Sequence, residues 1–597
     1  MEDFKYNPEE GFLNESEFPN PTDDTGVQAR TQFMRLLNQI KDFINNVLRV
    51  KKGDTPVKLR INSNKQAEFS EDGENWDVVV GTGEAGKGVP EGGAAGDYLE
   101  KVSDEAYDTT WKTPDNELTD DGETLVKGKT VKQYVDSKIY PTITVTLLSN
   151  DESSVEGQEI TITDVDTGEV IDTYSYTTPK PVKVAVETNY RVSVNDKQYY
   201  VKPKNVTGTV KFAKDIAITM TYKKMRRYGF RRAKTESNPT SRITYLFDAE
   251  GKAPAKMNLG STFDYGGWED FCNEVNRPVM LKKTGEVDYE LCHTDHSKRI
   301  DGITPSDYNN TAYAGNAMSE FRVFKYTKRY EDADYEYVIF CDGKYDDDYE
   351  CDAFIKDDGQ EYDTFYYGMY MGSNVSSCLR SVAGQGIMTG QTATTEYNYA
   401  KANGTNHNII SKCRWDYLLD LCTLISKCDN LQATFGNGFV GGSAQKTPGS
   451  HYNKGQFYGS TGSSDSVKVF YVEDPWGNVW ERMNGLINSS GSIKVKHKAP
   501  YPTPSDSDVY NEYTYVNNAP AEGYVKDAYG GALGFVPKTT GGSDSTYFCD
   551  YFYTNNSGIK FALVGGDWGN GLRCGRYVDL GYASSSTSGA VGSRISY

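Results

Sequence analysis

Apolar and polar residues alternate along most of residues 141–222, and this period of two is the feature that most limits the fold. The alternating residues are Ile143, Val145 and Leu147; Ile160 and Ile162; Val182, Val184 and Val186; Val192 and Val194; and Ile216, Ile218 and Met220. Because successive side chains of a strand point to opposite faces, each run predicts a strand with one buried face. Turn sequences such as DTGE and NDK separate the runs, so we expect an immunoglobulin-like or prealbumin-like β-sandwich over 141–224.

The composition favours several β-rich domains. The chain has 597 residues, of which 37% are apolar, 58 are glycine and 45 are tyrosine. This length allows about three or four domains, and tyrosine favours β structure and binding surfaces. We therefore expect a multidomain, mostly β protein.

Charge and hydropathy bear on the partners. The net charge of −20 repels phosphate backbones, so we expect no nucleic-acid partner. No apolar run is long enough to span a bilayer, and the N-terminus lacks the pattern of a signal peptide, so we expect no membrane insertion. None of the ten cysteines forms a CxxC pair, and isolated buried thiols are the expectation.

The first 56 residues predict an extended segment followed by a helix. Residues 1–28 are polar, and we expect them to dock on another protein. Over 29–50 the apolar residues are spaced four and three apart, at Phe33, Leu37, Ile40, Ile44 and Val47. This spacing is typical of a trimeric coiled coil and also of an ordinary amphipathic helix, and both interpretations stay open.

Residues 57–140 predict small β modules, one of which resembles a known type. The stretch 57–80 offers strands around a DG turn. The stretch 88–112 resembles a glycine-rich module of phage tail fibres and collar proteins. The matching residues are Gly88, Pro90, Gly92, Gly93, Gly96, Leu99, Lys101, Ser103 and Trp111. The resemblance implies a homotrimeric virion protein whose N-terminus contacts other virion components, assembled in the cytoplasm of a host bacterium.

Residues 225–597 are predicted to form a linker and one large unit. The basic run KKMRRYGFRRAK extends from Lys223 to Lys234 and predicts a solvated linker over 225–238. Residues 239–597 contain a helical pattern at 415–427 and long loops rich in glycine, serine, asparagine and tyrosine. Loops of this length are usually functional.

Two segments of this unit resemble one family. VKVFYVEDPWGNVWERMNGL (467–486) and the stretch 561–597 resemble retroelement-diversified proteins of the major tropism determinant type, whose fold is related to that of formylglycine-generating enzymes. The resemblance implies an α+β C-type-lectin-like domain over 239–597 that binds a bacterial surface glycan or protein.

The composition of the C-terminus supports diversification independently. Between Gly565 and Tyr597 there is no Lys, Glu, Gln or Met, and mutation of adenines in asparagine codons cannot produce these four residues. Tyr, Ser and Gly with a few Arg are typical of binding loops. The candidate receptor-binding residues are Asp567, Asn570, Leu572, Arg573, Cys574, Arg576, Asp579, Gly581, Tyr582, Ser584, Ser586, Thr587 and Ser588. The candidate framework residues are Gly565, Gly566, Trp568, Gly575, Leu580, Gly592 and Arg594.

No enzymatic motif, cofactor site or metal site is predicted. The oxidase chemistry of the related enzymes needs a placed cysteine pair, and Cys549 is the nearest cysteine to Cys574. His293 and His296 are expected to be solvated, and the alternating acids from Asp346 to Asp352 are expected to form an exposed edge. A tail-fibre receptor-binding protein is the main interpretation. A glycan-depolymerising tail spike and a head-decoration fibre stay open as alternatives.

Overall fold

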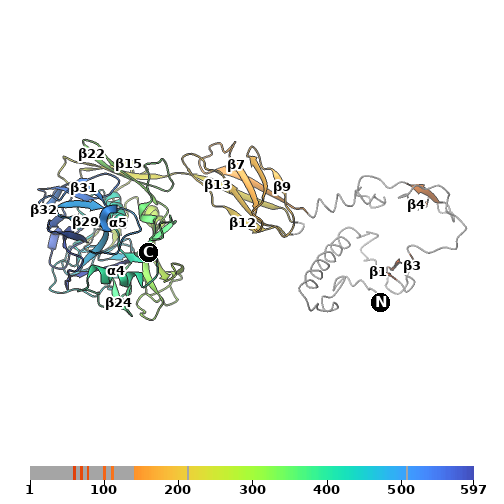
Figure 1. Ribbon diagram of the computed structural model, residues 1–597. Coiled ribbons are helices and arrows are strands. Elements are labelled where there is room, and N and C mark those ends of the chain that lie inside the picture. Colours follow the sequence, from red (N-terminus) through yellow and green to blue (C-terminus); the bar gives the residue numbers. More distant parts are fainter. Residues whose placement is uncertain are drawn as a thin grey trace.

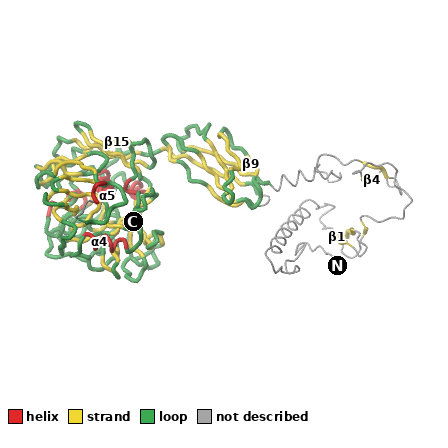
Figure 2. Tube along the Cα trace, in the orientation of Figure 1, coloured by secondary structure: helices red, strands yellow, loops and turns green. Residues whose placement is uncertain are grey.

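The computed structural model describes five short strands between residues 58 and 112, and residues 140–211, 214–505 and 509–597 (Figure 1). The predicted docking segment 1–28 and the predicted helix over 29–50 lie outside these residues. Where the chain is described it is dominated by strands and loops, with few helices (Figure 2). The prediction of a multidomain, mostly β chain is confirmed.

The N-terminal β modules are two small sheets. The first contains β1 (Lys58–Ile61), β2 (Ala67–Ser70) and β3 (Asp77–Val78), and the second contains β4 (Tyr98–Lys101) and β5 (Thr109–Lys112). In the second sheet Leu99 is the register partner of Trp111. The two large residues of the glycine-rich module are therefore opposite each other.

The alternating segment forms a β-sandwich of two four-stranded sheets, in the orders β12-β10-β7-β8 and β11-β13-β6-β9. The strands are β6 (Thr142–Ser149), β7 (Glu159–Asp164), β8 (Val170–Ser175), β9 (Pro181–Lys183), β10 (Asn189–Val194), β11 (Tyr200–Val201), β12 (Val206–Thr209) and β13 (Ile216–Lys224). The first and last strands, β6 and β13, pair in parallel, and the other pairs are antiparallel. Inward residues such as Ile143, Val145, Ile162 and Val192 are fully buried.

The C-terminal unit contains three larger sheets. The four-stranded sheet has the order β15 (Ile243–Phe247), β14 (Arg227–Ala233), β22 (Tyr335–Cys341), β21 (Tyr326–Glu331). The six-stranded sheet has the order β19 (Val287–Glu290), β18 (Asn276–Lys282), β20 (Gly315–Arg322), β23 (Thr364–Gly368), β38 (Ile595–Ser596), β26 (Asn408–Ile409). Strand β38 therefore places the end of the chain inside a sheet.

The nine-stranded sheet carries the C-terminal stretch of interest. Its strands are, in order, β31 (Thr514–Asn518), β30 (Ser492–Val495), β29 (Trp480–Ser489), β35 (Ile559–Val564), β36 (Val578–Tyr582), β34 (Tyr551–Thr554), β32 (Gly523–Tyr529) and β33 (Val536–Thr540), and β37 (Val591–Gly592) pairs with β29. Three two-stranded ribbons join β16 (Lys256–Met257) to β17 (Phe263–Asp264), β24 (Ser373–Val375) to β25 (Cys378–Arg380), and β27 (Lys468–Val469) to β28 (Val472–Glu473).

One helix lies at the centre of this unit. The four α-helices are α3 (Glu269–Val275), α4 (Ala393–Lys401), α5 (Lys412–Ser426) and α6 (Leu431–Phe435). The helix predicted over 415–427 is confirmed as α5, and every one of its residues is buried. Three of its charged residues are ion-paired: Lys412 contacts Asp416 at 2.5 Å, and Asp420 contacts two arginines. Pairing of this kind offsets the cost of burying charge.

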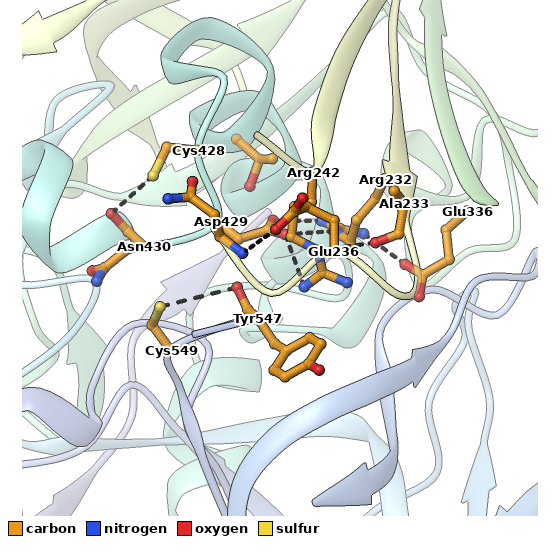
Figure 3. A network of polar contacts seen from close by, with 12 residues as sticks. Arg232, Ala233, Glu236, Arg242, Glu336, Cys428, Asp429, Asn430, Tyr547 and Cys549 are labelled. Atoms are coloured by element: carbon orange, nitrogen blue, oxygen red, sulfur yellow. Dashed lines mark hydrogen bonds and ion pairs between the residues drawn. The ribbon is translucent and has the colours of Figure 1, made fainter. Parts of the chain in front are cut away.

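The prediction of a solvated basic linker over 225–238 is wrong, because the centre of this segment forms strand β14. This strand pairs with both β15 and β22, and Phe230 is fully buried. Arg232 is also buried, and its guanidinium bonds to Asp429 and Glu336 at 2.7 Å (Figure 3). Acids far away in the sequence thus neutralise an arginine that looked solvated.

The described residues contain no disulfide bond and no membrane-spanning helix. All ten cysteines are free, and only Cys292 is partly exposed, as expected for isolated thiols. No helix in the described part of the chain is long and apolar enough to cross a membrane.

Candidate functional site

The predicted receptor-binding stretch lies on one strand, β36, and the loops at its two ends. It begins after β35, continues as a loop through 565–577, enters β36 and ends in the loop before β37. Strand β36 pairs antiparallel with β35 and parallel with β34. The stretch is therefore an extension of a sheet rather than a free tail.

Three glycines of the predicted framework are required by the backbone. Gly565, Gly566 and Gly575 have φ values of 85°, 81° and 99°, in the region that favours glycine. A Cβ atom on Gly566 would lie 2.5 Å from the sulfur of Cys574, and one on Gly575 would lie 2.3 Å from a carboxylate oxygen of Asp550. These positions hold the loop close against its neighbours.

The other framework residues also contact the interior. Arg594 is fully buried, bonds to Glu481 at 2.7 Å and donates to three backbone carbonyls. Leu580 is buried, and Gly592 lies in β37. Trp568 is only partly buried, and it packs against Met371, Ile387 and Val479. It therefore contributes less to the core than expected.

Hydrogen bonds fix the two loops of the stretch. The N–H of Trp568 donates to the carbonyl of Asn478 at 3.1 Å, and the N–H of Asp567 donates to the side chain of Asn570 at 2.6 Å. Farther along, the N–H groups of Gly390 and Ala393 donate to the carbonyls of Ser588 and Ser584, both at 2.9 Å. The loops are pre-organised, which lowers the entropy cost of binding.

Nine of the thirteen candidate receptor-binding residues reach the surface. Leu572 is 48% exposed, and Arg573 and Thr587 are exposed as well. The partly exposed candidates are Asp567, Asn570, Gly581, Tyr582, Ser586 and Ser588.

The structure corrects four candidates, because their side chains lie in the interior. Cys574 and Arg576 are fully buried, and Asp579 and Ser584 are only 8% and 7% exposed. Arg576 donates to Asp420 at 2.8 Å and to the hydroxyl of Thr423 at 3.1 Å. These residues stabilise the stretch and are not available to a ligand at its surface.

The structure adds tyrosines that the sequence analysis missed. The guanidinium of Arg573 lies 4.5 Å from the ring centroid of Tyr551, and Tyr551 makes edge contacts with Tyr524 and Tyr577 at 5.2 and 5.4 Å. Tyr553 is 36% exposed, next to Gly581. Strands β34 and β32 bring Tyr524, Tyr551 and Tyr553 to the stretch, and the alternation in YFYT was the available signal.

We call Arg573, Tyr524, Tyr551, Tyr553 and Tyr582 the tyrosine surface. Aromatic and arginine side chains of this kind provide most of the binding energy at many interfaces. Beneath it, burial raises the pKa of the Asp579 carboxyl from 3.8 to about 7, although the N–H of Gly581 donates to it at 2.7 Å. Burial also raises the pKa of Asp567. The surface therefore lies over one carboxyl that resists ionisation, Asp579, while Asp567 is partly exposed.

Two other sequence predictions need correction. His296 is fully buried beside Lys468 instead of solvated, and burial lowers its pKa. The acids from 346 to 352 do not form an edge strand, and Asp352 bonds to His497 at 2.7 Å. Among the described residues, no group of three or more His, Cys, Asp or Glu could hold a metal ion.

The comparisons with known proteins place the chain in no family. The sequence matches no protein-family model and no curated protein. The similar solved structures include the Bacillus anthracis TIE protein (10% identity, TM-score 0.14), where the match covers 31% of this chain and 28% of the other.

Two further similar structures are pilus proteins. The C-terminal fragment of the pilus adhesin SpaC from Lactobacillus rhamnosus GG has 13% identity and a TM-score of 0.14, with 28% of this chain and 68% of the other covered. A streptococcal ancillary pilin has 14% identity and a TM-score of 0.15, with 47% and 71% covered. Scores this low do not define a shared fold.

Proposed function

We propose that this chain is a phage tail-fibre-like receptor-binding protein, and that its tyrosine surface binds a glycan or protein on a bacterial cell. The N-terminal part docks on the particle and trimerises, the sandwich gives reach, and the C-terminal unit, a diversified C-type-lectin-like domain, binds the receptor. Three copies on one fibre would turn weak binding at one site into strong attachment.

One observation carries the proposal: exposed residues of a compositionally biased stretch lie on a rigid frame beside clustered tyrosines. The frame consists of glycines that tolerate no side chain and of arginines that are buried and ion-paired. The variable-looking side chains between them, such as Leu572 and Arg573, point outward. A fixed backbone with replaceable exposed side chains is the arrangement that a diversified binding surface needs.

The test is adsorption of the purified protein to host cells after a triple replacement, Arg573→Ala, Tyr551→Ala and Tyr582→Ala. Each anchor costs about 2 kcal/mol or more when truncated, so adsorption should fall nearly to background. A matched control is Tyr330→Ala, because Tyr330 is 40% exposed on β21, in another sheet. The control should adsorb normally.

Normal adsorption by a folded triple variant would place the receptor site elsewhere. The long loops of 290–465 would then be the next region to test.

Labelling of intact particles with an antibody to the sandwich would distinguish a tail fibre from a head-decoration fibre.

A further inference from the structure

A second cleft lies in the C-terminal unit, beneath the loop between strands β32 and β33. Its larger half is lined by Arg232, Arg329, Glu336, Asp420 and the turn from Tyr529 to Phe535. Its smaller half shares Arg329 and adds Asp352 and His497. The residues of the tyrosine surface do not line either half.

Glycines let the loop lie directly on the charged floor. A Cβ atom on Gly530 would lie 2.6 Å from Cγ of Glu336, and one on Gly534 would lie 1.8 Å from a carboxylate oxygen of Asp416. Gly534 has a φ of 74°, and its N–H donates to the carbonyl of Gly531 at 3.1 Å. A side chain at either position would displace the acid beneath it.

The arginines of the floor are already neutralised. Arg232 makes a two-pronged contact with Asp429 at 2.7 and 2.8 Å and donates to Oε2 of Glu336 at 2.7 Å (Figure 3). Arg329 donates to Asp420 at 3.0 Å and to the hydroxyl of Thr327 at 3.0 Å. An anion entering the cleft would find these positive charges occupied.

Buried carboxylate oxygens in the cleft remain unused, Oε1 of Glu336 in one half and Oδ1 of Asp352 in the other. Glu336 is only 2% exposed, and its Oε1 atom has no hydrogen-bond partner among the described residues. A buried acceptor of this kind destabilises the fold unless it is satisfied. Burial also raises the pKa of Glu336, and Arg232 and Arg242 oppose that shift.

The lining favours a cation. The two halves present two arginines, five carboxylates and His497. Like the arginines, most of these carboxylates are already paired: Asp420 contacts Arg329, Asp352 contacts His497, and Asp348 contacts Lys328 at 2.7 Å. The unpartnered Oε1 of Glu336 is therefore the feature of the lining that favours a cation. The rings of Tyr529 and Phe535 form part of the wall, and aromatic faces attract cations. The larger half has a volume of about 20 Å³. That volume admits a group the size of a water molecule and excludes a sugar ring.

We propose that this cleft binds a primary ammonium group, which donates to Oε1 of Glu336 and packs against Tyr529. The ammonium can be carried by an amino sugar or by a lysine side chain. Both have the same head group, so the cleft would recognise either. This site is separate from the tyrosine surface and does not depend on the function proposed for it.

Calorimetric titration of the full chain with propylammonium chloride tests the proposal. We expect saturable binding that falls about tenfold or more in Glu336→Gln, because hydrogen bonds to charged groups are the stronger ones. The matched control is Glu331→Gln. Glu331 is the cross-strand partner of Glu336, carries the same charge and does not line the cleft. The control should bind like the unmodified chain.

Titrations with other compounds distinguish the sources of the amine, and a second variant replaces Glu336→Gln if that variant does not fold. Glucosamine and an Nα-acetyl-lysine amide, each compared with propylammonium, show which carrier the cleft prefers, while N-acetylglucosamine and sulfate should not bind. If Glu336→Gln unfolds, Tyr529→Ala replaces it, and the loss of an aromatic wall should weaken binding severalfold. Absence of amine binding, equal binding of N-acetylglucosamine, or unchanged binding in folded Glu336→Gln and Tyr529→Ala would overturn the proposal.

Discussion

Two arginines three residues apart, Arg573 and Arg576, should respond to replacement in opposite ways. Arg573 is exposed over the ring of Tyr551, whereas Arg576 is fully buried and bonded to Asp420 and Thr423. The pair therefore separates recognition from stability within one loop. It also tests whether the tyrosine surface is a binding surface at all.

The contacts of the two arginines determine how much stability each replacement should cost. Breaking a buried ion pair costs about 3–5 kcal/mol, and the low end applies to Arg576→Ala because Asp420 keeps its contact with Arg329 at 3.0 Å. For a unit of about 370 residues the entropy of unfolding is about 0.8 kcal/mol per kelvin, so 3 kcal/mol lowers Tm by about 4 °C. Arg573→Ala should change Tm by less than about 1 °C, because exposed substitutions usually cost within about 0.5 kcal/mol.

The assay measures thermal unfolding and host adsorption on the same preparations. Arg573→Ala should lose affinity by about thirtyfold, which corresponds to the 2 kcal/mol typical of an interface anchor. Arg576→Ala should still adsorb at temperatures where it is folded. An Arg576→Ala variant with unchanged Tm, or an Arg573→Ala variant with normal adsorption, would refute the division of roles.

Three further predictions concern pH, assembly and chemistry. The pKa of Asp579 is raised to about 7 in the folded chain, so folding retains a proton that the unfolded chain loses above its ordinary value of 3.8. The contribution of Asp579 to stability should therefore fall by up to about 4 kcal/mol as pH rises from about 4 to about 7, and Asp579→Asn should remove that part of the fall in thermal unfolding curves. The part due to Asp474, whose pKa is also raised to about 7, should remain. The intact protein should have the mass of a homotrimer at micromolar concentration, and a monomer or dimer would contradict the fibre assignment. Incubation with host capsule or wall glycan should release no new reducing ends, whereas steady release would favour a depolymerising tail spike.

The elements that could be predicted from the sequence are those whose pattern is local. The sandwich follows from period-two alternation, and α5 follows from the helical pattern at 415–427. Strand β14 could not be recognised because its arginines look solvated. The acids that neutralise Arg232 lie 104 and 197 residues away in the sequence.

The candidate site was predictable as a region but not residue by residue. The bias in composition marked 565–597, and the sequence distinguished the framework glycines from the candidate receptor-binding residues. Arg573 and Arg576 look alike in the sequence, and only the approach of α5 decides which of them is buried. Tyr551 and Tyr553 join the surface because β34 pairs in parallel with β36, a contact that no local pattern encodes.

Helix α5 explains how such a surface can vary without unfolding the domain. Asp416 and Asp420 are one turn apart and contact groups from three different segments: His497 at 3.5 Å, Arg329 at 3.0 Å and Arg576 at 2.8 Å. Asp420 thus joins the floor of the second cleft to the loop that carries Arg573. Since these contacts are buried, they are screened little by salt and do not depend on the exposed side chains. Exposed positions of the loop can therefore change at little cost to stability, as long as Arg576 remains.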